Sequence, residues 1–180
     1  MIYYMHGMSK PYIMTLDIEY DKEKLIQVAG IILKNIGKNV YQIYRSFNSY
    51  IKQENLSIFV QQYTNITQEF IAQYGVSLSE SIEAWNKFVE DIDYDDMLVV
   101  SHGIYQDSII LKNNGFDIAP YEQWCTYNMS KWVLDRDYDI SLSDLCQEFG
   151  MIPISTHNAY ADSLMTLNIL SVLLKIEEDT

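Results

Sequence analysis

The hydrophobic residues near the start of the chain follow the pattern of β-strands. Segments rich in Ile, Val, Tyr and Phe cover residues 12–21, 24–35 and 40–52. Short polar breaks separate them, with Lys22 in the first break and Asn39 in the second. β-Branched and aromatic residues are enriched in strands, and short polar connections are typical of antiparallel neighbours. The pattern therefore predicts three consecutive antiparallel strands.

Further along the chain the apolar positions take mainly helical spacing. Residues 77–91 place apolar side chains on one face behind serines that suit a helix start, and Gly75 and Gly150 are typical helix ends. The predicted helices cover residues 66–75, 77–91, 105–116, 141–151 and 158–177, with a buried strand at 97–103 and a segment at 122–136 that suits either strand or helix. Three leading strands followed by alternating helices and strands predict a mixed-sheet α/β or α+β layer fold.

The length and cysteine content indicate a single cytoplasmic domain. A chain of 180 residues can bury the core of one sheet with covering helices, and no linker or repeat divides it. Residues 1–10 are compatible with an extension before that domain. Cys125 and Cys146 are too far apart for a metal knuckle and too few for a disulfide framework, so we expect them to serve packing in a reducing compartment. The chain has no run of 18 apolar residues and no basic segment followed by an apolar one at its start, so we expect no membrane association.

The charge of the chain limits its partners. The formal net charge is −13 and the isoelectric point is about 4.4. Such a surface argues against broad electrostatic attraction to nucleic acids or to anionic membranes. A polyanionic substrate would therefore need local binding groups.

Acidic residues that suit a metal site occur in the first predicted strand and just after the buried strand at 97–103. Asp17 and Glu19 are two apart in the first strand, so both side chains project from the same face. Asp107 follows the buried strand at 97–103 and begins a helix. Hard divalent cations such as Mg²⁺ select carboxylate oxygens. The alternatives are a solvated strand end for the pair and, for Asp107, a first-turn acid favoured by the helix dipole.

Asp162 lies at the start of the last predicted helix, in an unusual position for a charge. It shares a helical stripe with the apolar residues Met165, Ile169 and Leu173, which directs it towards the core. Either a cation compensates this carboxylate, or Asp162 caps the first turn of the helix. His157 lies five residues earlier, about 140° beyond a full helical turn, so we expect it in the preceding loop.

The order and surroundings of these residues resemble the DEDDh 3′→5′ exonucleases, the superfamily of the proofreading subunit of bacterial replicative polymerase, RNase T and oligoribonuclease. Asp17 and Glu19 on a first strand, followed by "KLIQVAGI" on the second, resemble the first motif. "SHGIYQDSIIL" resembles the second motif, and "HNAYAD" matches the third, His-x-Ala-x-x-Asp. The likeness spans roughly residues 12–173 and predicts that this range forms the domain core.

This resemblance implies a ribonuclease H-like α/β fold with helices on both faces of the sheet. It also implies that Asp17, Glu19, Asp107 and Asp162 hold two divalent cations, Mg²⁺ or Mn²⁺, with His157 as the general base. Two ions about 4 Å apart activate a water and stabilise the attacking and leaving oxygens of a phosphoryl displacement. The ions would supply the counter-charge that Asp162 requires.

Three further residues are candidates for contacts with substrate. Ile18 and Tyr20 flank Glu19 and either offer an apolar and stacking surface to a terminal base or simply pack in the strand. Tyr20 stands where many members of the resembled family have Thr or Ser. His102, in the second motif, either reaches a phosphate or closes the loop.

The sequence thus predicts a metal-dependent exonuclease that releases nucleoside 5′-monophosphates from the 3′ ends of RNA or single-stranded DNA. The acidic composition favours short or single-stranded substrates, or a protein partner that supplies binding surface, and a homodimer is compatible with the resemblance. One alternative is a non-catalytic interaction module that keeps the fold. Another is a ribonuclease H-like endonuclease, which fits the acids but explains His157 less well.

Overall fold

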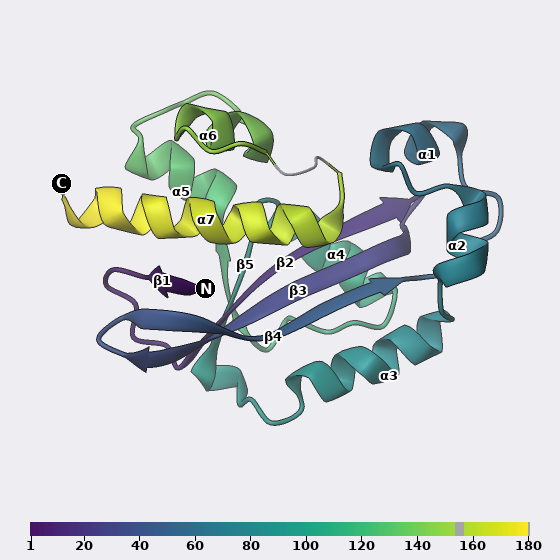
Figure 1. Ribbon diagram of the computed structural model, residues 1–180, viewed down its shortest axis with the longest axis horizontal. Coiled ribbons are helices and arrows are strands. Elements are labelled where there is room, and N and C mark those ends of the chain that lie inside the picture. Colours follow the sequence, from purple (N-terminus) through teal and green to yellow (C-terminus); the bar gives the residue numbers. More distant parts are fainter. Residues whose placement is uncertain (154–156, 180) are drawn as a thin grey trace.

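One mixed sheet of six strands forms the centre of the computed structural model, which describes residues 1–153 and 157–179 (Figure 1). The strands are β1 (Ile2–Tyr4), β2 (Tyr12–Asp21), β3 (Lys24–Gly37), β4 (Val40–Tyr50), β5 (Met97–Ser101) and β6 (Glu122–Cys125). Their order across the sheet is β1-β4-β3-β2-β5-β6, with β5 and β6 parallel to β2 and the other neighbours antiparallel. The predicted run of three antiparallel strands is confirmed.

Seven helices surround this sheet in the described part of the chain. They are α1 (Ile58–Thr64), α2 (Gln68–Tyr74), α3 (Leu78–Val89), α4 (Ile104–Asn113), α5 (Thr126–Val133), α6 (Leu142–Glu148) and α7 (Ala159–Glu178), and a 3₁₀ turn, Tyr94–Asp96, precedes β5. The segment that suited either strand or helix divides at Cys125, where β6 ends and α5 begins. The sequence did not predict β1 or α1.

Two tight turns set the register of the leading strands. Lys22 and Glu23 join β2 to β3 with φ of 49° and 68°, and Lys38 and Asn39 join β3 to β4 with φ of 54° and 57°. A two-residue turn with both residues left-handed matches the natural twist of a hairpin. The polar breaks in the sequence are therefore hairpin turns.

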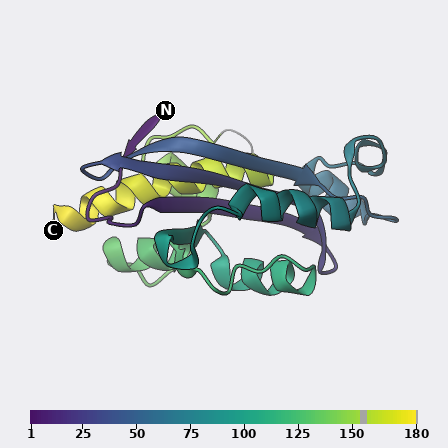
Figure 2. The ribbon, with the colours of Figure 1, turned by 90° about the horizontal axis from the view of Figure 1, so that it is seen from below.

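The two faces of β2 meet different helices. Met14, Leu16 and Ile18 belong to the core that packs against α3 and α4, whereas Ile13 belongs to the core beneath α7. Figure 1 views the sheet from the side that α7 covers, and Figure 2 shows α3 and α4 beside the strands from below. Because side chains alternate along a strand, Asp17 and Glu19 share the α7 face with Ile13.

The helix α7 is covered on two sides. Leu167, Leu170 and Leu174 face the sheet, and Met165 and Ile169 form a second core with α5 and α6. The helix is long and apolar enough to cross a membrane by composition, but 61% of that stretch is buried, as in the core helix of a layered fold. This double burial explains why apolar residues occur on more than one side of the helix.

The first residues of the chain also belong to the fold. Residues of β1 pair with β4, and Tyr3, Met5 and Met8 are buried in the core beneath α7. Cys125 and Cys146 are buried as free thiols, which agrees with their predicted packing role.

Candidate active site

The strand β2 carries two carboxylates on the face beneath the start of α7. Asp17 pairs with Ala29 and Glu19 with Gln27 in the register with β3. Asp17 is half-buried and Glu19 is buried. Because both residues are paired with β3, their side-chain positions are set by the sheet rather than by a loop.

The start of α7 brings Asp162 to the same place. Asn158 caps the helix by accepting from the Ala161 N–H at 3.2 Å, and Gln27 of β3 accepts from the Ala159 N–H at 3.1 Å. The His157 N–H donates to Oδ2 of Asp162 at 3.0 Å. Oδ1 of Asp162 is buried and has no hydrogen-bond partner among the described residues. One oxygen of Asp162 therefore accepts at the helix start, as in the capping alternative, and the other has no partner among the described residues.

Asp107 joins from the first turn of α4, which begins just after β5. The Ser101 hydroxyl donates to Oδ2 of Asp107 and accepts from the Gly103 N–H at 3.1 Å. Asp107 is buried at this position. The electrostatic influence of Asp107 on Asp17 and Glu19 places all four carboxyls in one cluster.

The environment raises the pKa of each of these carboxyls above its usual value. Burial, followed by repulsion from Asp107, Asp162 and Glu19, holds the pKa of Asp17 well above its usual range. Burial and repulsion from Asp162 and Asp107 raise the pKa of Glu19 to about 8. Burial raises the pKa of Asp107 to about 7 against the opposing bond from Ser101, and that of Asp162 to about 6 against the backbone bonds of His157 and Asn158. No Lys or Arg of the described chain forms an ion pair with them.

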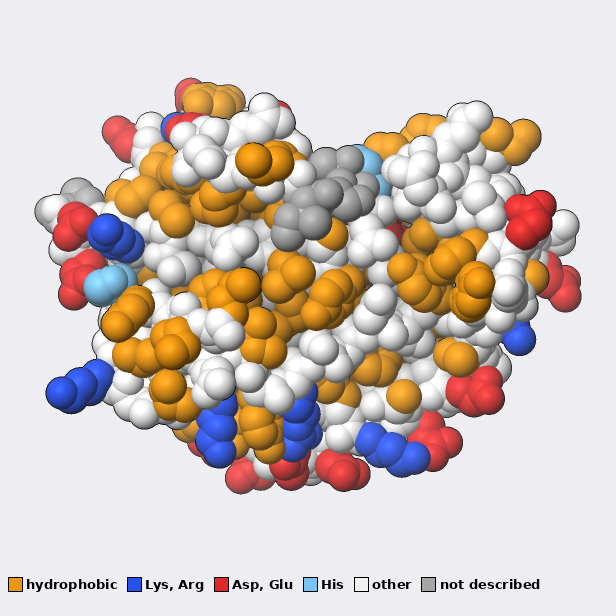
Figure 3. Space-filling view, viewed as in Figure 1, with side chains coloured by type: hydrophobic (Ala, Val, Ile, Leu, Met, Phe, Trp, Pro, Cys, Tyr) orange, Lys and Arg blue, Asp and Glu red, His pale blue; other side chains and the backbone are white. Residues whose placement is uncertain are grey.

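His157 lies in the loop before α7, where the sequence predicted it. Its backbone is left-handed, with φ of 60°. A ring nitrogen of His157 and carboxylate oxygens of Glu19 and Asp162 lie within 4.8 Å of one another. Burial lowers the pKa of His157, which favours the neutral imidazole. In the space-filling view the surface is hollowed between α6 and α1, above this end of α7 (Figure 3).

Sequence reasoning missed Tyr63, which contributes to the site from α1. Its ring stacks on that of His157, with centroids 3.5 Å apart and planes at 29°. Burial and the charges of Glu19 and Asp162 raise the pKa of Tyr63. The sequence signal was weak, because α1 is short and a tyrosine in a polar stretch has no distinctive spacing to a distant histidine.

Comparison with known proteins agrees with this arrangement of residues. The exonuclease family RNase T matches residues 10–170 of the chain, which include every residue of the cluster. The chain belongs to this family. The predicted resemblance to the DEDDh exonucleases is thereby confirmed, and a search of curated protein sequences finds no match.

Solved structures of exonucleases share the fold of this family member. Cell-death related nuclease 4 superimposes with a TM-score of 0.73 at 17% identity, over 93% of this chain and 64% of that protein. The nuclease domain of 3′hExo, a DEDDh family member bound to rAMP, gives 0.65 at 17% identity, over 94% and 93%. Exonuclease I of E. coli with a dT13 oligonucleotide gives 0.68 at 13% identity, over 89% and 40%. The chain thus spans about two thirds of the first of these proteins and less than half of the third. These likenesses confirm the ribonuclease H-like exonuclease fold.

The side chains of this acidic cluster fit divalent cations. The carboxylates offer only oxygen atoms, which hard cations such as Mg²⁺ and Mn²⁺ select. Mutual repulsion among buried acids and the unpaired Oδ1 of Asp162 are the features that a bound cation would relieve. The chemistry of the cluster therefore agrees with the divalent metals that are typical of the family.

The other predicted substrate contacts divide between exposed and internal positions. Ile18 is buried in the core on the opposite face of β2, so strand packing is the role that the structure supports. Tyr20 is exposed at the end of the same strand. The ring nitrogens of His102 contact Oγ1 of Thr126 at 3.0 Å and the carbonyl of Ile140 at 3.2 Å. Because both nitrogens are engaged, His102 closes its loop rather than facing a phosphate.

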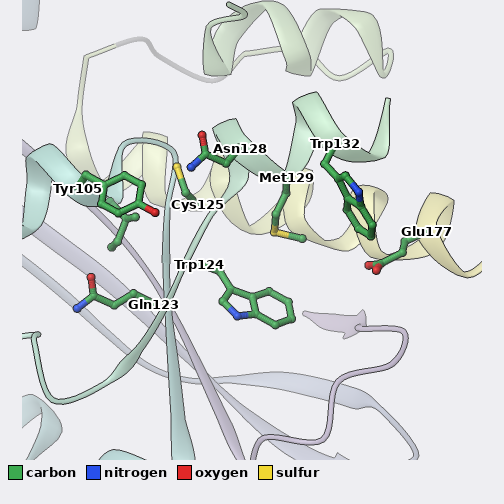
Figure 4. A pocket seen from close by; sticks show the side chains of 9 residues that line it. Tyr105, Gln123, Trp124, Cys125, Asn128, Met129, Trp132 and Glu177 are labelled. Carbon is green, nitrogen blue, oxygen red and sulfur yellow. The ribbon is translucent and has the colours of Figure 1, made fainter. Parts of the chain in front are cut away.

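A separate pocket lies at the free edge of the sheet. It has a volume of about 390 Å³ and is formed by β6, α5, the start of α4 and the end of α7. Trp124, Met129 and Trp132 line it, together with Tyr105 and Glu177 (Figure 4). None of the clustered acids lines this pocket, so its aromatic surface is distinct from the acidic cluster.

Proposed function

We propose that this protein is a metal-dependent 3′–5′ exonuclease that releases nucleoside 5′-monophosphates from the 3′ ends of RNA or single-stranded DNA. The observation that carries the proposal is the cluster of four carboxyls from β2, α4 and α7, beside His157 and without a paired Lys or Arg in the described chain. A buried group of like charges is costly for stability, so its presence in a member of an exonuclease family supports a role in catalysis.

Each side chain has a defined task in this proposal. Asp17, Glu19, Asp107 and Asp162 would hold two divalent cations, Mg²⁺ or Mn²⁺. Such cations lower the pKa of a bound water and stabilise the charge that develops on the phosphate oxygens. His157 accepts a proton at a ring nitrogen, for which its lowered pKa keeps the imidazole neutral near pH 7. Ser101 orients the Asp107 carboxylate by its hydrogen bond.

The related structures support single-stranded 3′ ends of either polymer as candidate substrates. Exonuclease I was solved with a DNA oligonucleotide, and the 3′hExo nuclease domain with rAMP. A further 3′-exonuclease, with a TM-score of 0.73 at 14% identity over 96% of this chain and 66% of its own, was solved in recognition of the 3′ end of a histone mRNA stem-loop. The charge of −13 favours short or single-stranded substrates here, because few cations are available to contact a long duplex. A protein partner or a second copy of the chain would add binding surface.

The decisive experiment follows the fate of labelled ends. Single-stranded RNA and DNA carrying a 3′ or a 5′ label are incubated with Mn²⁺ and wild type, Asp17→Ala or His157→Ala. Asp137→Ala, at an exposed acid away from the cluster, serves as the matched control. We expect wild type and the control to release the 3′ label first as a mononucleotide. His157→Ala should lose about 10²–10⁴-fold in rate, the usual contribution of a general base, and Asp17→Ala should lose nearly all activity.

Two results would overturn this proposal. If substrates with a blocked 3′ end are still cut, the protein is an endonuclease of the same fold. If folded wild type, verified by circular dichroism, cuts neither polymer, the chain is an interaction module that keeps an acidic cluster.

A further inference from the structure

Three aromatic rings form a column that leads from the surface to the acidic cluster. Phe59 and Tyr63, one helical turn apart on α1, stack with centroids 5.5 Å apart and planes at 15°. Tyr63 then stacks on His157 at 3.5 Å and 29°. Phe59 is 70% exposed and Tyr63 48% exposed, so the column would not form merely to bury apolar area.

Within the described part of the chain, few contacts hold the ring of His157. The His157 N–H bond to Asp162 fixes the backbone but leaves rotation about the side-chain bonds free. No hydrogen bond to a ring nitrogen of His157 is present among the described residues, and within them its ring contact is the one with Tyr63. A proton acceptor must keep its nitrogen aimed at one point, so the ring needs a lateral support.

The helix α1 is itself fixed relative to β2, which carries Asp17 and Glu19. Ser57 caps the helix by accepting from the Val60 N–H at 3.2 Å, and the Ser57 N–H donates to Oδ2 of Asp21 at 2.6 Å. Asp21 ends the strand that carries the two carboxylates. Val60 packs into a small core with Ile26 of β3. Tyr63 is thus held in the same frame as the acids.

We propose that Tyr63 is a positioning residue, whose ring holds the imidazole of His157 at the distance from Glu19 and Asp162 at which it can accept a proton. This deepens the proposed function and rests on it for the role of His157. Stacking between two flat rings restricts tilt while it leaves both imidazole nitrogens open at the ring edge. The hydroxyl of Tyr63 is not required for this task.

The test separates the ring of Tyr63 from its hydroxyl. Tyr63→Phe keeps the ring, Tyr63→Leu removes it, and Tyr74→Leu on α2 removes a tyrosine that is 59% exposed and contacts Phe70 instead. The first readout is the NMR signal of the His157 ring protons in the metal-free protein. The chain has three histidines, so His157→Ala assigns the signal. We expect the upfield ring-current shift in wild type, Tyr63→Phe and Tyr74→Leu, and its loss in Tyr63→Leu.

The second readout is turnover of a single-stranded oligonucleotide with Mn²⁺. We expect Tyr63→Leu to lose about 10- to 100-fold in kcat, as a misplaced reacting group does, with little change in KM or in Mn²⁺ affinity by calorimetry. Tyr63→Phe and Tyr74→Leu should keep wild-type kcat.

An unchanged His157 signal or an unchanged kcat in Tyr63→Leu would overturn the positioning role, as would an equal loss of kcat in Tyr63→Phe. If wild type cuts no nucleic acid, the proposed function fails. The NMR comparison would still decide whether Tyr63 orients the imidazole.

Discussion

The acidic residues of the cluster carry negative charge that no cationic side chain of the described chain neutralises. Glu19 and Asp107 are buried beside other acids, and Asp162 keeps one buried oxygen without a partner in the described chain. Ordinary buried carboxylates are paired or hydrogen-bonded. The cluster therefore lowers the stability of the metal-free protein in exchange for a site that attracts cations.

This electrostatic cost predicts an unusual pH dependence. The pKa of Glu19 rises to about 8 and that of Asp107 to about 7 in the folded state, against about 4 for unfolded carboxyls. Between these values the folded state binds more protons than the unfolded state, so stability falls as pH rises. We expect the Tm of the metal-free protein to decrease from about pH 5 to about pH 8, measured by calorimetry with a chelator.

A variant of one buried carboxyl and added Mn²⁺ serve as controls for this Tm measurement. Glu19→Gln cannot ionise, so the decrease in Tm should be smaller in this variant. Added Mn²⁺ should raise the Tm of wild type more at the higher pH, because deprotonated carboxylates bind the cation. A Tm of the metal-free protein that rises across this range would contradict the inferred coupling among the acids.

At the scale of elements, local signals in the sequence determine where several helices begin. Ser77 caps α3 by accepting from the Glu80 N–H at 3.3 Å, and the Glu80 carboxylate accepts from the Ser77 N–H at 2.8 Å. This reciprocal capping box holds a helix whose Trp85 and Phe88 pack in the main core. The cap at the start of α3 thus stabilises the helix that packs on one face of the sheet.

Loss of that cap should destabilise the whole domain. We expect Ser77→Ala to reduce the free energy of unfolding by about 1 kcal/mol, measured by urea denaturation. Asn86→Ala, at an exposed position inside the same helix, is the control and should have little effect or a slight stabilising one. A loss for Asn86→Ala equal to that for Ser77→Ala would show that the effect is not due to the cap.

At the scale of the whole molecule, the net charge of −13 opposes the approach of a nucleic acid. Most proteins that bind nucleic acids lose affinity as salt is added, because their cations release counterions from the phosphates. Here the long-range electrostatic interaction between the protein and a nucleic acid is repulsive, not attractive. In the proposed function, the attraction needed for binding would come from cations held by the carboxyls and from short-range contacts.

The activity of this molecule should therefore respond to salt in the opposite direction. Raising NaCl from about 10 mM to about 150 mM shortens the screening length from about 30 Å to about 8 Å. We expect the KM for a short single-stranded oligonucleotide at fixed Mn²⁺ to fall over this range while kcat stays constant. A KM that rises steeply would indicate a local basic patch that outweighs the net charge.

Local patterns in the sequence were sufficient for most elements of the fold. The strand predicted at 12–21 matches β2, and the last predicted helix matches α7 within a residue at each end. Both are long segments in which the spacing of apolar residues repeats many times. In contrast, β1 has three residues, too few to show a period, and α1 lacks the glycine stop that marked α2 and α6, helices of the same length. Both β1 and α1 are defined by their packing against the sheet.

The sequence by itself determined the residues of the acidic cluster, because the motifs that carry Asp17, Glu19, Asp107 and Asp162 are local and ordered. Only the tertiary structure decided how other side chains relate to that cluster. In the folded chain, Ile18 is buried in the core on the opposite face of β2, and a ring nitrogen of His102 contacts Thr126. The ring of Tyr63 stacks on that of His157. These outcomes depend on which face of a strand is covered and on which distant element packs there. Such non-local burial leaves no repeating signal along the chain.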